Sequence, residues 1–495
     1  MNPWEKAVLV TYYAVLAVLS IYGTHRYLLV YLYYRHKHRR HEPGRRFEEP
    51  PRVTVQLPLF NEATVVERLI DAVCAIDYPR DRLDIQVLDD SVDETVELAR
   101  RKVAEMAALG FRIQHIRRDD RTGFKAGALD HGLRRTDAEF VAIFDADFVP
   151  RPDILKQTID HFTDPKVGMV QARWGHINRR FSLLTRIQSI FLDGHFVIEH
   201  AARNRSGRFF NFNGTAGIWR KSCIAAAGGW QHDTLTEDLD LSYRAQLEGW
   251  RFVFLPEVVS PGELPVEMNA FKTQQHRWAK GSIQVCRKLL PTIWRAKIPL
   301  KVKIEASFHL TNNFAYLLMI ALALLMLPAL LARLSDDSLA RSLLFDFSLF
   351  LAATTSMLAF YTASQREAYR DWKKTFLYFP MLIALGIGIS VNNAKAVLEA
   401  IFGHETPFVR TPKYNVGERR AARSLFRYAG SRQGLPLFEI ALGMYFAVIT
   451  GIAFSHHLIV TGCFLSLFMS GYFWVGVASL IRPRTRKADL PAPAL

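Results

Sequence analysis

Two aspartates lie two positions apart after a short apolar run. Residues 140–144 predict a buried strand, and Asp145-Ala146-Asp147 follows it directly. In a strand-like stretch, residues i and i+2 point to the same side, so the two carboxylates repel each other unless a cation lies between them. Hard cations such as Mg²⁺ or Mn²⁺ bind carboxylate and phosphate oxygens. The pair therefore predicts a divalent-cation site that can hold a diphosphate, with a charged turn as the alternative.

A second acidic pair, Asp89-Asp90, follows another predicted strand at 85–88. A carboxylate at a strand end can accept hydrogen bonds from a ribose hydroxyl or a base. The alternative is structural, because Asp90 and Ser91 precede a helical pattern and could cap it.

The third motif, Thr236-Glu237-Asp238, opens an amphipathic helical pattern that continues to Glu248. Threonine and acidic residues are favourable at a helix start, so a cap explains them. A general base held at a helix N-terminus is the functional interpretation.

The fourth motif is Gln274-Gln275-His276-Arg277-Trp278, within an amphipathic stretch at 268–290. An arginine can neutralise a leaving diphosphate, and an indole face can stack on a sugar ring. The alternative is a tryptophan at a membrane interface with a snorkelling arginine.

An alternating α/β domain must position the first motifs. Strands are predicted at 53–57, 85–88, 112–116, 140–144, 167–172 and 252–255, and helices at 63–76, 93–108, 125–133, 153–162 and 238–248. This alternation predicts a doubly wound α/β sheet, in which ligands bind at the carboxyl ends of strands.

Long apolar runs flank this domain, at 7–33, 310–331, 343–363, 376–391, 440–453 and 458–481. Each except 376–391 is interpreted as a membrane span or anchor. Placing 376–391 in the interface keeps every basic segment, at 35–46, 297–303, 364–374, 410–432 and 482–487, on one side of the membrane. By the positive-inside rule that side is the cytoplasm, and the N-terminus faces outward.

The composition narrows the class of protein. The 495 residues carry a formal net charge of +16, but no basic-aromatic module accompanies the charge, so nucleic acid is not an expected partner. The four cysteines are far apart and show no CxxC spacing, which argues against a zinc site or a disulfide framework.

Together, the four motifs resemble the processive, membrane-bound β-glycosyltransferases of family 2, which include cellulose, hyaluronan and chitin synthases. The sequence resembles plant cellulose synthase-like mannan and glucomannan synthases still more closely. The segments that carry this resemblance are 87–91 (VLDDS), 123–129 (GFKAGAL), 142–148 (AIFDADF), 170–174 (VQARW), 212–217 (FNGTAG) and 274–278 (QQHRW). The resemblance implies a GT-A-type nucleotide-diphospho-sugar domain inserted after the first span of a multi-span helical protein.

The resemblance also implies residue roles. Nucleotide-sugar binding falls to Asp89, Asp90, Lys125, Asp145 and Arg277, metal binding to Asp145 and Asp147, catalysis as the base to Asp238, and acceptor binding to Glu237, Gln274 and Trp278. A gating loop resembling Phe-x-Val-Thr-x-Lys is expected at 403–434, with Phe408, Thr411 and Lys413 in place and Arg410 instead of valine.

We therefore expect an N-terminal anchor at 1–34, a cytoplasmic transferase domain at 35–265, interfacial helices at 266–305 and a transmembrane region at 306–495. The expected reaction is inverting, processive transfer of mannose or glucose from GDP-mannose or UDP-glucose, assisted by Mg²⁺ or Mn²⁺, with the β-glycan passed across the membrane and unknown export subunits as possible partners. One alternative is a non-processive enzyme that glycosylates diacylglycerol or ceramide. A non-enzymatic transporter or receptor would have broken acidic motifs, and here they are intact.

Overall fold

The computed structural model describes residues 2–39, 41–334, 339–404, 411, 413–415 and 434–481, without side-chain detail at 339–346. Of the expected gating-loop residues, Thr411 and Lys413 are described, whereas Phe408 lies outside the described residues.

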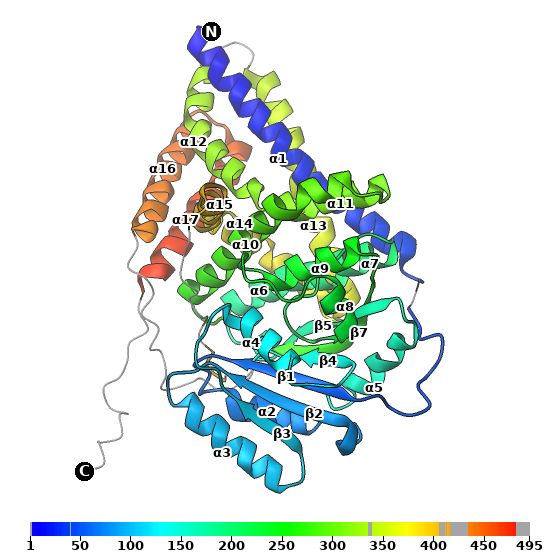
Figure 1. Cartoon of the computed structure of the whole chain (residues 1–495). Coiled ribbons are helices and arrows are strands. Elements are labelled where there is room, and N and C mark those ends of the chain that lie inside the picture. Colours follow the sequence, from blue (N-terminus) through cyan, green and yellow to red (C-terminus); the bar gives the residue numbers. More distant parts are fainter. Residues whose placement is uncertain are drawn as a thin grey trace, which may run out of the picture.

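A seven-stranded mixed sheet forms the centre of the broad half of the molecule (Figure 1). Its strands are β1 (Val53–Leu59), β2 (Leu83–Asp89), β3 (Arg112–Ile116), β4 (Phe140–Ile143), β5 (Val167–His176), β6 (Gly217–Arg220) and β7 (Arg251–Gly262), in the order β3-β2-β1-β4-β6-β5-β7. All neighbouring strands are parallel except β6, which runs antiparallel to β4 and β5. The six predicted strands are present, and the unpredicted β6 makes the sheet mixed.

Helices cover both faces of the sheet, as the alternating pattern predicts. The predicted helices form α2 (Val66–Cys74), α3 (Thr95–Ala108), α4 (Phe124–Leu133), α5 (Ile154–Thr158) with the 3₁₀ turn η2 (Ile159–Thr163), and α9 (Glu237–Leu247). The remaining elements of this half are η1 (Arg80–Arg82), α6 (Leu183–Asp193), the π-helical segment η3 (Gly194–His200), α7 (Ala201–Arg205) and α8 (Lys221–Ala226).

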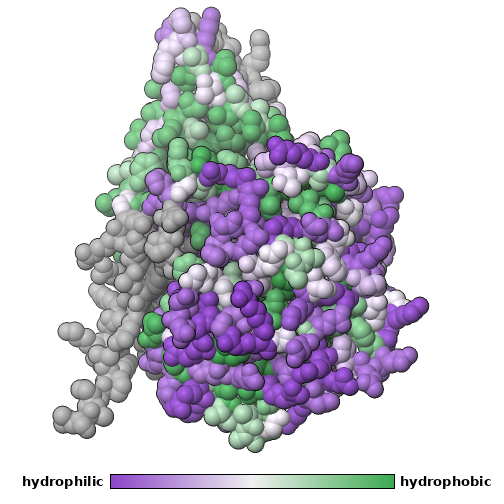
Figure 2. Space-filling model, in the orientation of Figure 1, coloured by the Kyte–Doolittle hydropathy of each residue, from purple (hydrophilic) through white to green (hydrophobic). Residues whose placement is uncertain are grey.

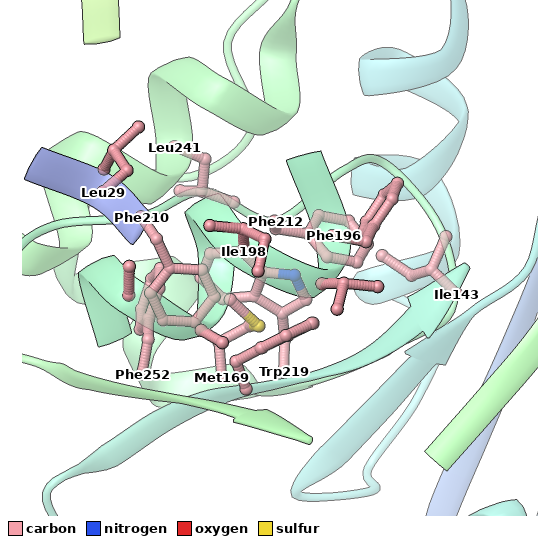
Figure 3. Packing of buried hydrophobic residues seen from close by; sticks show 14 of the residues in the cluster. Leu29, Ile143, Met169, Phe196, Ile198, Phe210, Phe212, Trp219, Leu241 and Phe252 are labelled. Carbon is pink, nitrogen blue, oxygen red and sulfur yellow. The ribbon is translucent and has the colours of Figure 1, made fainter. Parts of the chain in front are cut away.

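A large hydrophobic cluster packs η3 against one face of the sheet. It contains Phe196 from η3, Phe210, Trp219 from β6 and Phe252 from β7, all buried (Figure 3). Leu29 from the first helix of the chain belongs to the same cluster. The cluster also extends to Phe360 and Tyr361 of α13. The sheet domain therefore shares one core with several apolar helices, among them α1 and α13.

The narrow half of the molecule consists of long helices. These are α1 (Pro3–His36), α12 (Phe314–Leu334), α13 (Leu339–Ala368), η4 (Trp372–Tyr378), α14 (Phe379–Gly388), α15 (Ser390–Phe402), α16 (Leu435–Ser455) and α17 (Ile459–Leu480). Figure 2 shows that hydrophobic side chains cover this half, whereas hydrophilic ones cover the half that contains the sheet. Within the described residues, six helical stretches are long and apolar enough to cross a membrane. The chain is thus a multi-span membrane protein.

The stretch from η4 to α15 is one of these six, although 376–391 alone seemed too short for a span. It is 31 residues long, and more than half of its apolar part is buried inside the protein. Figure 1 shows α15 nearly end-on, across the direction of α1, α12 and α16. This orientation concerns 390–402 only, and the interfacial position expected for 376–391 stays a prediction.

Helices α10 (Met268–Arg295) and α11 (Leu300–Thr311) lie between the two halves (Figure 1). Lys272 of α10 donates hydrogen bonds from Nζ to both carboxylate oxygens of Glu439 on α16, at 2.7 and 2.8 Å. The same ammonium lies 3.3 Å from Ser479 Oγ on α17. This buried pair anchors α10 to the membrane helices, and α10 carries the fourth motif to the sheet.

Candidate active site

A cleft with about 1320 Å³ of empty space, partly open to solvent, lies between the carboxyl ends of the strands and α10. The predicted site residues that line it are Asp90, Lys125, Asp145, Asp147, Glu237, Asp238, Gln274, Arg277, Trp278, Thr411 and Lys413. They come from six separate segments of the chain. Of the described predicted residues, only Asp89 does not line the cleft.

Asp90 follows β2 at one end of the cleft. The Arg118 guanidinium donates to both of its oxygens, with Nε 3.0 Å from Oδ1 and Nη2 2.5 Å from Oδ2. Helix α3 begins only at Thr95, with Glu94 at the cap position, so neither Asp90 nor Ser91 caps it. The capping alternative for this motif is therefore wrong.

Asp89 faces away from the cleft. Its Oδ2 lies 2.8 Å from His115 Nε2 on β3, and Oδ1 accepts the Ser91 amide hydrogen at 2.9 Å. Burial favours the neutral acid, but the hydrogen bonds from His115 and Ser91 outweigh it and lower the pKa of Asp89. Of the two aspartates predicted to contact the nucleotide, only Asp90 lines the cleft. The Asp89 side chain instead holds the end of β2 in place.

Lys125, at the start of α4, is paired with Asp145. Its Nζ lies 2.5 Å from Asp145 Oδ1 and donates to the Gly214 carbonyl at 2.9 Å. Burial opposes the charge, but Asp145, Glu237 and Asp238 together raise the pKa of Lys125. A Cβ on Gly214, whose φ is +78°, would lie 3.0 Å from Asp238 Oδ2 and 3.2 Å from Lys125 Nζ. Position 214 therefore requires a glycine, because any side chain there would crowd Asp238 and Lys125 and would strain the backbone.

Asp147 accepts a hydrogen bond from Lys413 Nζ at 2.6 Å. Of the expected gating loop, Thr411 and Lys413 line the cleft, and Thr64 Oγ1 donates to the Lys413 carbonyl at 2.7 Å. The Tyr414 amide donates to Glu263 Oε1 at 2.8 Å. Lys413 thus lies beside Asp147, and Thr411 lines the same cleft, although both are far from Asp147 in sequence.

The two aspartates fit a divalent cation that arrives with its diphosphate. Asp145 and Asp147 each hold an ammonium group, from Lys125 and Lys413, which shows that cations are favourable at both carboxylates. Among the described residues, no group of three or more His, Cys, Asp or Glu side chains could hold a metal ion. Magnesium is commonly bound by one or two carboxylates plus substrate phosphates, and this pair matches that pattern.

Asp238 lies in the first turn of α9, where Thr236 makes no side-chain cap hydrogen bond. Burial and the neighbouring Glu237 raise the pKa of Asp238 to about 7, although Lys125 opposes the rise. Its Oδ1 accepts the Leu239 amide hydrogen at 2.8 Å. A carboxyl group with such a pKa can accept a proton near neutral pH.

Gln274, Arg277 and Trp278 on α10 form the wall next to the membrane half. The ring of Trp278 lies 6.5 Å from that of Trp174 at the end of β5, measured between centroids. Both tryptophans line the cleft, so the interpretation of Trp278 as a simple membrane-interface residue is not favoured.

Sequence reasoning assigned no role to several residues at this cleft. Arg118 holds Asp90, and Trp174 and His176 line the cleft beside Trp278. Trp174 ends one of the segments that carry the family resemblance, which was an available signal. Arg118 lies in a loop without periodicity, and nothing in the sequence marks it as the partner of Asp90.

Comparisons with known proteins identify relatives of this chain and of its fold. Residues 50–281 match the family model described as glycosyltransferase like family 2. Glucomannan 4-beta-mannosyltransferase 1 of Oryza sativa subsp. japonica is 43% identical over 291 residues, which are 56% of this chain and 55% of the relative. Glucomannan 4-beta-mannosyltransferase 2 of Arabidopsis thaliana is 43% identical over 271 residues, 54% of this chain and 50% of the relative. The chain thus spans about half the length of the curated relatives it matches.

Among solved structures, the mannosyltransferase PcManGT from Pyrobaculum calidifontis, in complex with GDP-Man and Mn²⁺, has a TM-score of 0.53 and 23% identity. The match covers 79% of this chain and 99% of that protein. At this identity the likeness concerns the fold. The expected GT-A-type α/β fold, followed and preceded by apolar helices, is confirmed.

Proposed function

We propose that this chain, whose residues 50–281 match the family model described as glycosyltransferase like family 2, is an inverting hexosyltransferase that transfers mannose from GDP-mannose to a β-glycan. The motifs alone left mannose and glucose open, and the relatives named as glucomannan 4-beta-mannosyltransferases favour mannose. One observation carries the proposal: Asp90, Lys125, Asp147, Asp238 and Trp278 all line a single cleft.

The donor occupies the strand-end side of the cleft. Asp90, held by Arg118, receives hydrogen bonds from the nucleoside. Lys125 and Arg277 provide positive charge around the diphosphate. Asp145 and Asp147 would hold a Mg²⁺ or Mn²⁺ ion, which offsets negative charge on the leaving diphosphate when bound.

Asp238 acts as the general base. Its carboxylate removes the proton from an acceptor hydroxyl, whose oxygen attacks the anomeric carbon as the bond to the diphosphate breaks. Because attack comes from the face opposite the leaving group, an α-linked donor gives a β-linked product. Positioned general bases supply about 10²–10⁴-fold of rate enhancement.

The acceptor occupies the α10 side, against Glu237, Gln274 and Trp278. We propose that transfer is processive and that the membrane helices above α10 pass the glycan outward. The continuity of the sheet domain with α1 and α13 through one hydrophobic cluster supports this coupling. The basic flanks favour a cytoplasmic transferase domain. We retain the division at 1–34, 35–265, 266–305 and 306–495, with the gating loop at 403–434.

The test uses the full chain in lipid nanodiscs with radiolabelled GDP-mannose or UDP-glucose and Mn²⁺. We expect label from GDP-mannose in a product that an endo-β-mannanase degrades. Asp238→Asn should bind GDP-mannose with unchanged affinity but incorporate at least about 100-fold less label. A monoglycosylated lipid as sole product would establish the alternative acceptor, and absence of transfer with both donors would refute the proposal.

In inside-out vesicles, a glycan protected from added mannanase until detergent is present would support passage across the membrane. A glycan that is fully accessible without detergent would contradict it.

A further inference from the structure

The end of β5 contributes a wall of the cleft that has no assigned role. Trp174 and His176 are two positions apart on this strand, so they share one face. Both line the cleft. The ring of Trp174 packs against Phe148 and Phe196, at centroid distances of 5.1 and 4.9 Å, which fixes the indole in place. Its 6.5 Å separation from Trp278 puts two indoles side by side.

His176 is held by a buried carboxylate. Its side chain is 2% exposed, and Nε2 lies 3.1 Å from Asp193 Oδ1 at the end of α6. Burial favours neutral Asp193, but His176, Gln365 and Arg173 outweigh it and lower the pKa of Asp193. Because Asp193 is then ionised and can only accept a hydrogen bond, His176 Nε2 carries the proton and donates a hydrogen bond to Asp193 Oδ1. Within the part of the chain that the structure describes, the other ring nitrogen of His176, Nδ1, has no hydrogen-bond partner.

Asp193 is itself saturated by donors from the membrane half. Gln365 Nε2 of α13 donates to Oδ2 at 2.7 Å, and the Tyr369 hydroxyl lies 3.3 Å from Oδ1. Burying the charge of Asp193 has a large desolvation penalty, and apolar residues at this contact would stabilise the packing of α13 on the sheet domain equally well or better. What the carboxylate adds is orientation, because it fixes which imidazole nitrogen carries the proton.

We propose that Trp174 and His176 form a second sugar-binding subsite beside Trp278, with Asp193 as the residue that positions His176. The indole face stacks on a hexose ring, and His176 Nδ1 accepts a hydrogen bond from a sugar hydroxyl. The acceptor is then a β-linked oligosaccharide held through two neighbouring units rather than a single lipid-linked sugar. This inference rests on the proposed function, since it assumes that Trp278 contacts the acceptor.

The experiment measures sugar binding without turnover. Full-length protein in nanodiscs is titrated with mannose and with β-1,4-mannobiose by calorimetry, in the presence of GDP and Mn²⁺. We expect the wild type to bind the disaccharide at least about tenfold more tightly than the monosaccharide. His176→Ala should abolish this preference and leave GDP affinity within about twofold. Asp193→Asn, which keeps an acceptor oxygen for Nε2, should retain more of the preference than Asp193→Ala.

His131→Ala is the matched control, because His131 lies on α4 and does not line the cleft. If His176→Ala does not fold, His176→Phe keeps the volume and removes the ring nitrogens, and the same loss is expected. A disaccharide preference that survives in the folded His176 variant overturns the inference, as does a variant whose GDP affinity falls instead. Wild-type protein that transfers mannose without any disaccharide preference refutes the subsite alone. Disaccharide binding without transfer from either donor refutes the proposed function and leaves the subsite standing.

Discussion

The pH dependence of transfer should respond to the charge next to the base. Burial and Glu237 raise the pKa of Asp238 to about 7, so near pH 7 about half of the molecules have Asp238 ionised, which is the form that the proposed base needs. We expect kcat/KM for GDP-mannose to rise with pH to a plateau, with a midpoint near 7. Glu237→Gln removes the like charge but not the burial, so the midpoint should move down without reaching the ordinary value of 3.8.

The size of this shift can be worked out. If removing the neighbouring charge lowers the pKa by about one unit, the midpoint of the variant lies near 6. At pH 6 the variant then has about half of its base ionised, against about a tenth in the wild type. Relative to its own plateau, Glu237→Gln should therefore be about fivefold more active than the wild type at pH 6. Plateaus are compared separately, because Glu237 also lines the acceptor side.

The assay is GDP release from GDP-mannose at subsaturating donor between pH 5 and 9, with Asp233→Asn as the control. Asp233 is an exposed acid just before the motif that does not line the cleft. If the acid limb of Glu237→Gln coincides with that of the wild type while donor affinity is unchanged, Asp238 is not the group that titrates.

The same pKa shift predicts an effect on stability. The folded-state pKa of Asp238 is raised, so the folded protein binds more protons than the unfolded one between about pH 4 and pH 7, and stability falls as pH rises through that window. Asp238→Asn removes the free-energy penalty of ionising this buried carboxyl group, which is about 4 kcal/mol as an upper limit. Its melting temperature should exceed that of the wild type at pH 8 and approach it at pH 4. Equal melting temperatures at pH 8 would contradict the raised pKa.

Other contacts give predictions of their own. Asp147→Asn should weaken Mn²⁺ binding at least about tenfold in calorimetry with GDP present, and unchanged affinity would remove Asp147 from the cation site. Lys272→Met leaves Glu439 buried without its partner and should cost about 3–5 kcal/mol of stability, measured by thermal unfolding in detergent. Adding Glu439→Leu should restore most of it, and a double variant as unstable as the single one would contradict this account. Gly471→Val should lower the melting temperature, since a Cβ there would lie 2.3 Å from the Ala384 carbonyl oxygen of α14; an unchanged value would mean that α14 and α17 do not pack this closely.

Local patterns predicted much of the sheet domain because its elements follow ordinary periodicities. All six strands with a clear apolar run are present, and helix α3 ends at Ala108 as expected. Strand β6 was not predicted because Gly217–Arg220 is only four residues long. All four residues are buried, so the segment lacks the alternation of buried and exposed residues that marks a strand. The π-helical segment at 194–200 has no sequence signature of its own.

The composition of the cleft was largely predictable, whereas its internal pairing was not. The motifs identified Asp90, Asp147 and Asp238 by type and position. The partners that set their charge come from distant parts of the chain: Lys413 reaches Asp147 across 266 positions. Asp89 looked equivalent to Asp90, and only the fold shows that His115 on the neighbouring strand holds its side chain out of the cleft.

The hydrophobic cluster that joins Leu29 of α1 and Phe360 of α13 to the sheet has a practical consequence for anyone preparing this protein. A water-soluble fragment cut out between the apolar helices would expose the surface that those residues cover, and it should aggregate. Enzymology on this chain therefore belongs in a bilayer or a detergent micelle, with the apolar helices left attached.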